Sequence, residues 1–347
     1  MFLVAGTRRT IPTSPMVGCS TRYIHRDKLM PLRDLAEYFN QRIVEEQNLA
    51  EPPLSVRAGQ VESRAGGLRL ATEFHPIRRA NIPSVIMGHD AALRAFPPET
   101  SQSMAVKVFH LADIDDVINL DRLCRTIHML NYLPIAHENG YLFLHVHPRH
   151  VLGVKRDHGA YFEEVIFRCG LVPRRVVISV AVSPLYDRQF TQLQKGMKNY
   201  QSRGYSTAIK FDDQANEAFL EGYCIEFLYR ITPDFVRLDS GFFSKLRHGE
   251  EDGEHRDSLL SVIHRLDTEL LVEGIKDESD AQLADRLRPA YVKGDYYERS
   301  LQSPFNYSIF NIRELLLGHI ILQGTCTQDG LIERPLLLPF VKKKCCT

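Results

Sequence analysis

From about residue 70 onward, short apolar runs alternate with segments whose apolar residues recur at helical spacing. The short runs have the length and composition of strands; they lie at 72–79, 84–93, 140–148, 175–183, 206–211, 235–240, 270–275 and 289–297. Helical spacing is found at 114–133, 161–171, 189–204, 216–231 and 258–269. Roughly eight strands alternating with helices predict an α/β fold, a TIM-like (β/α)8 barrel.

A doubly wound parallel sheet is the alternative interpretation. That fold binds phosphate at a glycine-rich turn after its first strand, and no such turn follows residues 72–79. The pattern therefore favours the barrel. Because chemistry in a barrel is placed at the C-terminal ends of the strands, candidate functional residues are sought there.

Residues 1–68 follow a different pattern. Apolar residues at near-helical spacing after Pro31 predict an amphipathic helix over about 31–48; they are Leu32, Leu35, Tyr38, Phe39 and Ile43. Residues 49–67, with paired prolines and glycines, predict a linker or loop. Burying five large side chains at ~1.5–3 kcal/mol each favours docking of the helix on the barrel or on a second copy, which would form a homodimer.

This pattern predicts three regions: an N-terminal helical extension over 1–68, a barrel over 69–305, and a C-terminal extension over 306–347. The last region ends in a basic tail that contains Cys345 and Cys346.

Composition limits the function classes. Lysine and arginine balance aspartate and glutamate at 43 each, so no overall charge attracts nucleic acid or an anionic membrane. The chain contains no run of 18 apolar residues, so the sequence predicts no transmembrane helix. At its start a short apolar piece precedes the arginines, which is the reverse of the order in a signal peptide. We expect a cytoplasmic protein. The cysteines show no zinc spacing, and Cys124, Cys169 and Cys224 lie in apolar periodic segments typical of buried residues.

Eight short motifs, in order along the chain, resemble those of EAL domains, bacterial barrel-shaped phosphodiesterases of cyclic di-GMP. The motifs are FHPI, GHDAALR, LFLHVHP, VVISVAVS, GYSTAIKFDD, PDFVRLDSGFF, LLVEGIK and KGDYYERSL. They are similar to the family's F-Q-P-I, G-x-E-A-L-L-R, L-x-x-N-V-S-P, V-I-E-I-T-E-S, G-F-x-L-A-L-D-D-F-G, P-D-Y-L-K-I-D-x-x-F-I, V-I-A-E-G-V-E and Q-G-Y-Y-F-S-x-P. The resemblance spans about Phe74 to Pro304.

The resemblance implies a site where carboxylates and one amide hold two divalent ions that activate water. Most of those positions differ here, so the sequence resembles a degenerate EAL domain. The name-giving glutamate corresponds to Asp90, the asparagine to His145, and the two glutamates of I-E-I-T-E to Ser179 and Val182. The paired aspartates correspond to Lys210 and Phe211, the lysine of K-I-D to Arg237, the second glutamate of V-I-A-E-G-V-E to Lys276, and the glutamine of Q-G to Lys293. Asp239 and Glu273 match the family.

This set predicts loss of the family's hydrolysis. Two divalent ions need several hard oxygen ligands, and at most three acids remain: Asp90, Asp239 and Glu273. Lys210 places a positive charge where a carboxylate is wanted, which costs several kcal/mol per metal charge at an effective dielectric of about 20. We predict no catalytic residue, no metal and no cofactor. The alternative metal ligands are the histidines of HVHPRH, His145, His147 and His150.

The substitutions also place cations at the expected barrel mouth. The predicted ligand-binding residues are Arg94, Lys210, Arg237 and Lys293, with His75 and Tyr296 beside them. Such a ring can hold an anion, while Tyr296 and Phe211 can offer flat surfaces to a base. The opposite interpretation is that the remaining acids pair with most of these cations.

Three functional hypotheses follow. The first is an inactive EAL-like regulator that acts through a protein partner in bacterial signalling. The second is a receptor that binds cyclic di-GMP or another anion without cleaving it. The third is a phosphodiesterase with residual activity.

Overall fold

The computed structural model describes residues 31–65, 67–96, 114–136, 140–154, 159–215, 219–220, 224–248 and 253–301. The chain divides into two compact units, residues 1–297 and 298–347, and almost all described residues belong to the first. The predicted C-terminal extension over 306–347 lies outside the described residues. Within the described part of the chain, no helix is both long and apolar enough to cross a membrane.

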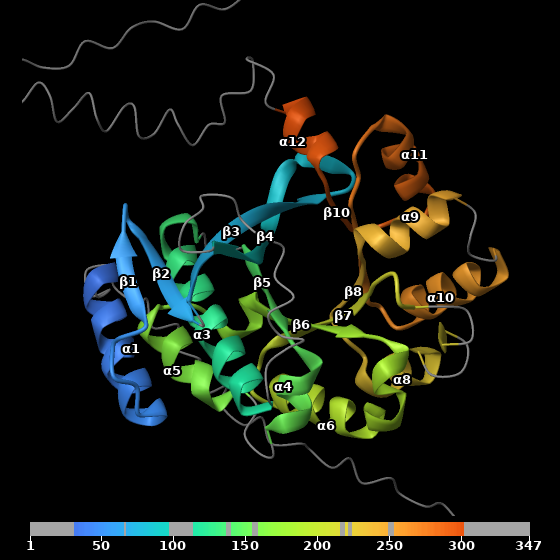
Figure 1. Ribbon diagram of the computed structural model, residues 1–347. Helices are drawn as coiled ribbons and strands as arrows, with labels where there is room; N and C mark the ends of the chain where they lie inside the picture. Colours follow the sequence, from blue (N-terminus) through green and yellow to red (C-terminus); the bar gives the residue numbers. More distant parts are fainter. Residues whose placement is uncertain are drawn as a thin grey trace, which may run out of the picture. The chain divides into compact units, whose positions relative to one another are not determined.

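Eight strands close into a barrel, as the apolar runs predict (Figure 1). The strands are β3 (Leu68–Arg79), β4 (Ile82–Phe96), β5 (Tyr141–Val146), β6 (Val176–Val182), β7 (Ser206–Phe211), β8 (Phe235–Leu238), β9 (Glu269–Glu273) and β10 (Tyr291–Lys293). From β4 to β10 each strand pairs in parallel with the next. β3 closes the barrel and is antiparallel to both β4 and β10.

The antiparallel β3 departs from regular alternation of strand and helix. Only residues 80 and 81 separate β3 from β4, and a parallel crossover needs a dozen or more residues. The two strands therefore form a long hairpin.

Helices surround the barrel (Figure 1). They are α3 (Ile114–Tyr132), α4 (Pro148–Gly153), α5 (Ala160–Arg168), α6 (Phe190–Ser202), α8 (Ile225–Ile231), α9 (Ser240–His248), α10 (Gly253–Arg265), α11 (Glu278–Arg286) and α12 (Asp295–Leu301). Short 3-10 helices follow α3 (η2, Leu133–Ile135), precede β6 (η3, Pro173–Arg175) and follow β6 (η4, Pro184–Gln189). Cys124, Cys169 and Cys224 are buried, as predicted.

One apolar layer fills the lower barrel, and each of the eight strands contributes one residue to it. The residues are Ile77, Met87, Phe143, Val177, Ala208, Phe235, Leu271 and Tyr291. Met87 joins the layer through a bulge, since Ile77 pairs with Gly88 while Arg78 pairs with Ile86. A Cβ on Gly88 would lie 2.3 Å from the Tyr141 carbonyl oxygen, so glycine allows the close approach of β4 and β5.

The prediction of a linker over residues 49–67 is wrong. Two strands, β1 (Leu54–Arg57) and β2 (Gln60–Ala65), form a hairpin there, and β2 continues the sheet by pairing with β3. Ala58 and Gly59, both with positive φ, make the two-residue turn. The alternation of buried Val61 and Ser63 with more exposed neighbours is the strand signal behind the glycines and prolines.

The predicted N-terminal helix is present as α1 (Leu32–Gln47) and packs within its own chain. Leu35, Phe39 and Ile43 are fully buried. The Asn40 side chain donates to the Leu54 carbonyl at 2.9 Å and accepts from the Leu54 amide at 2.7 Å. This pairing ties α1 to β1, and the buried apolar face of α1 is covered by its own chain.

Truncation of a buried α1 side chain tests this packing. Phe39 is 0% exposed. A Phe39→Ala variant should have an unfolding free energy about 3–5 kcal/mol lower than the wild type, because the cavity adds to the lost burial. Urea unfolding of the full chain measures this change. Glu45→Ala, at an exposed α1 position, is the control and should change stability by less than about 0.5 kcal/mol. A loss below about 1 kcal/mol for Phe39→Ala would show that α1 is not docked.

Candidate functional site

A polar layer lies directly above the apolar layer, toward the C-terminal ends of the strands. In β5 to β10 its residues follow the apolar ones by two positions, which keeps them on the inner face. Each strand again contributes one residue: His75, Asp90, His145, Ser179, Lys210, Arg237, Glu273 and Lys293. All of them were singled out by their sequence positions.

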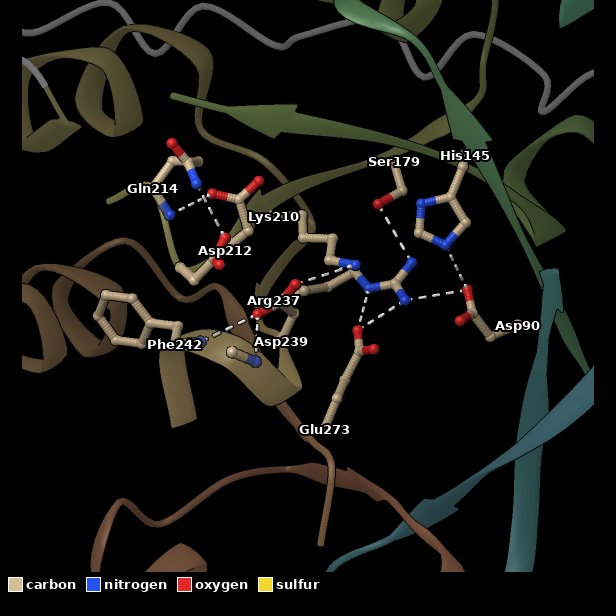
Figure 2. A network of polar contacts seen from close by, with 12 residues as sticks. Asp90, His145, Ser179, Lys210, Asp212, Gln214, Arg237, Asp239, Phe242 and Glu273 are labelled. Atoms are coloured by element: carbon tan, nitrogen blue, oxygen red, sulfur yellow. Dashed lines mark hydrogen bonds and ion pairs between the residues drawn. The ribbon is translucent and has the colours of Figure 1, made fainter. Parts of the chain in front are cut away.

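Arg237 stands at the centre of this layer (Figure 2). Its Nε and Nη2 each lie 2.6 Å from Glu273 Oε1, and Nη2 lies 2.9 Å from Asp90 Oδ1. Nη1 donates to Ser179 Oγ at 3.1 Å. The guanidinium also lies 5.3 Å from the ring centre of Phe143 in the apolar layer below. Its side chain is 0% exposed, so this cation is part of the barrel core.

The two lysines are also paired. Lys293 donates to Asp90 Oδ2, and its Nζ lies 2.8 Å from Glu273 Oε2. Lys210 Nζ lies 3.4 Å from Asp239 Oδ2. The other Asp239 oxygen accepts from the backbone amides of Gly241 and Phe242 at 2.8 and 3.0 Å and caps α9. Lys210 thus pairs with one carboxylate, whereas Lys293 pairs with two, and the Lys210 contact is the longer.

These pairings keep the carboxylates ionised. Burial alone would raise the pKa of Asp90 and Glu273, but Arg237 and Lys293 outweigh it and hold both pKa values below the ordinary range. Burial alone would lower the pKa of Lys293, but Asp90 and Glu273 raise it above its ordinary value. Three cations therefore face three carboxylates, including Asp239, and the network is balanced in charge.

Arg94 does not join the other cations, contrary to the expected convergence. β4 continues past the barrel rim, and Arg94 lies four residues beyond Asp90, about 13 Å along an extended strand. It pairs with Glu73 of β3, whose Oε2 is 3.4 Å from His75 Nε2. The predicted ring of four cations is in fact a network of three, with a separate pair on the β3–β4 hairpin.

Three other predicted positions have contacts different from those of the residues around Arg237. Phe211 is fully buried and packs against Phe242 with ring centres 6.3 Å apart, so it offers no flat surface at the mouth. Tyr296 of α12 packs edge-on against Tyr297. Lys276 is exposed after β9, and its backbone amide donates to Asp280 Oδ2 at 2.9 Å.

The three histidines proposed as alternative metal ligands point to different partners. His145 Nε2 lies 3.1 Å from Asp90 Oδ1, and His147 Nδ1 accepts from the Arg149 amide. His150 is buried in the helical layer, 3.2 Å from Asp121 Oδ2 and 3.0 Å from Arg125 Nη2. The three do not form a common site.

The buried pair of Asp121 and Arg125 on α3 was missed in the sequence. Asp121 Oδ1 accepts from the His147 amide at 3.0 Å, so the pair holds the turn that follows β5. Arg125 is 1% exposed, donates to Tyr200 and lies 3.9 Å from the Phe162 ring centre. Its i, i+4 spacing was visible, but the same spacing usually marks an exposed helix pair.

The polar layer does not fit two divalent cations. Among the residues that the structure describes, no group of three or more histidine, cysteine, aspartate or glutamate side chains is arranged to hold a metal ion. Asp90 and Glu273 are the two acids of the layer, and both are neutralised by Arg237 and Lys293.

Comparisons with known proteins agree with this architecture. A sequence model of the EAL domain matches residues 61–300. The fold is similar to that of the PaMucR phosphodiesterase in complex with c-di-GMP, at 18% identity over 66% of this chain and 90% of that chain, with a TM-score of 0.51. A search of curated proteins finds no match.

Two further solved structures have the same fold. A standalone EAL protein from Vibrio cholerae O395, bound to c-di-GMP, is 16% identical over 65% of this chain and 90% of that chain, with a TM-score of 0.52. The YkuI protein of Bacillus subtilis, in complex with c-di-GMP and calcium, is 16% identical over 73% of this chain and 61% of that chain, also with a TM-score of 0.52. At these identities the likeness is one of fold.

Replacement of Arg237 tests the electrostatics of the site. Arg237→Met leaves two buried carboxylates without their main partner and should cost about 3–5 kcal/mol of unfolding free energy at pH 7. The ion pairs lower the folded-state pKa values of Asp90 and Glu273. The stabilisation that the two ionised carboxylates provide is therefore fully present above their ordinary pKa of about 4, and it is lost as the pH falls through the folded-state values.

The difference between variant and wild type should therefore shrink below about pH 4, as chemical denaturation at several pH values would show. Arg94→Met is the control, since its pair with Glu73 is 42% and 39% exposed and contributes about 0–1 kcal/mol. Equal, pH-independent losses for both variants would contradict the account.

Proposed function

Because this chain belongs to the EAL domain family, we propose that it is a non-hydrolysing member that regulates a protein partner in bacterial second-messenger signalling. One observation carries the proposal. The Arg237 guanidinium contacts Asp90, Ser179 and Glu273, the positions where the family resemblance implies metal ligands. A resident cation thus stands among these positions.

The chemistry of metal-dependent hydrolysis supports this interpretation. Two-metal catalysis needs a set of oxygen ligands with excess negative charge, so that the ions can polarise the phosphate and activate water. Here the acids are balanced by buried cations. A dication would have to displace Arg237 or Lys293 and leave that cation unpaired in the barrel, at a cost of several kcal/mol.

The same balance disfavours strong binding of an anion at the mouth. A phosphate would have to compete with carboxylates that already contact each of the three cations. Four cavities lined by described residues, of 180 to 650 Å³, all lie away from the polar layer. Surface features instead support protein contact: Leu185, after β6, is 75% exposed and Phe167, on α5, is 81% exposed.

A second candidate function is a receptor that binds cyclic di-GMP without cleaving it. Lys210 is the observation that favours it. Its contact with Asp239 is 3.4 Å long, and Asp239 retains its two backbone partners on α9 if the lysine leaves. Lys210 can therefore turn to a ligand phosphate at smaller cost than Arg237 or Lys293.

Hydrolysis and binding assays separate the hypotheses. With magnesium or manganese, the full chain should turn over cyclic di-GMP at less than about 0.01 per second, against typical enzyme values near about ten. A titration without metal should show no saturable binding if the protein acts by protein contact alone. Linear GpG product above that rate would overturn the proposal, while saturable metal-free binding without product would favour the receptor.

Lys210→Asp tests the receptor directly. If cyclic di-GMP binds at the mouth, its affinity should fall steeply with salt, persist in EDTA and drop at least about tenfold in this variant, because an attractive charge becomes repulsive. Lys195→Asp, at an exposed position on α6, makes the same change in net charge and should leave affinity within about twofold. Equal affinity of Lys210→Asp and wild type would exclude Lys210 from the binding site.

A further inference from the structure

A cavity of about 650 Å³ lies away from the mouth, between the N-terminal hairpin and the barrel. It is lined from the end of α1, from β2, β3 and β4, and from the first turns of α3, which group together in Figure 1. Six leucines form most of its wall: Leu49, Leu68, Leu70, Leu93, Leu120 and Leu123. Its volume is within the range of pockets that bind small organic ligands.

The lining defines the chemical class of the ligand. The described residues that line the cavity include no aromatic side chain, so a nucleotide base would find no ring to stack on. Branched aliphatic walls favour a saturated hydrocarbon chain, which gains free energy through burial alone.

One cation complements this apolar surface. Arg64 of β2 lines the cavity, is exposed, and its side chain makes no ion pair with any residue that the structure describes. Its backbone amide donates to the Pro53 carbonyl at 3.2 Å, which fixes β2 beside the loop that follows α1. A guanidinium at the edge of an apolar cavity binds a carboxylate in bidentate geometry.

Asp116 is the opposing charge in the lining. It lies in the first turn of α3, where a carboxylate stabilises the helix N-terminus. Toward an anionic ligand Asp116 is repulsive, so it provides a variant whose effect has the opposite sign to that of Arg64.

We propose that this cavity binds an aliphatic carboxylate, with its chain along the leucines and its head group at Arg64. No residue of the polar layer lines the cavity, so the site is independent of the function proposed for the barrel mouth. Because its walls come from both the N-terminal hairpin and the barrel, a bound chain connects the two and stabilises the folded state.

Calorimetric titration of the full chain with dodecanoate, below its micelle concentration, tests the proposal. Saturable binding with one site is expected, together with a rise in melting temperature. Arg64→Gln should weaken binding about twofold to fivefold, and Asp116→Asn should leave it equal or tighter. Leu120→Gln should weaken binding because it places a polar side chain in the apolar wall of the cavity. Leu185→Gln, at an exposed position after β6, should leave binding unchanged.

Three results would overturn the proposal: no saturable binding, equal affinity of Arg64→Gln and wild type, or equal affinity for dodecyltrimethylammonium. Residues 97–113, which join β4 to α3 in the sequence, are the competing occupant from the chain itself. If they filled the cavity, dodecanoate would not bind, and the proposal would fail on the first result. The Arg64 and Asp116 variants change exposed side chains, so their folding is not at risk.

Discussion

The ion pairs of Arg237 with Asp90 and Glu273 are the constraint on which the rest of the barrel mouth depends. All three side chains are at most 5% exposed, and each charge would be costly without the others. Lys293 completes the neutralisation of both carboxylates, and Ser179 Oγ accepts a hydrogen bond from Nη1 of the guanidinium. The charges of this interior are therefore balanced within the chain itself.

The layering of the barrel makes this arrangement possible. Each strand contributes an apolar residue to the lower layer and a polar one above it, so the ion pairs lie directly on the buried apolar layer. The Phe143 ring below Arg237 joins the two layers. Within the polar layer, Lys210 contacts Asp239, which caps the start of α9.

Much of this could be predicted from the sequence, because strand periodicity and motif order determine which residues share the inner face. The partners of each charge could not, since pairing depends on how the strands are staggered around the barrel. Arg94 illustrates this, because nothing in its motif reveals that β4 runs past the rim. The β1–β2 hairpin was missed because its prolines and glycines are as typical of a turn as of a linker. The pair of Asp121 and Arg125 was missed because side chains at this spacing on a helix are usually exposed.

A resident guanidinium occupies the space among the positions where the family resemblance implies metal ligands. Manganese titration monitored by electron paramagnetic resonance tests it most directly, because bound manganese loses the sharp signal of the free aqueous ion. We expect the signal of free manganese to stay unchanged when the full chain is added in molar excess over the metal. Loss of the signal in proportion to protein, reversed by Asp90→Asn or Glu273→Gln, would contradict it.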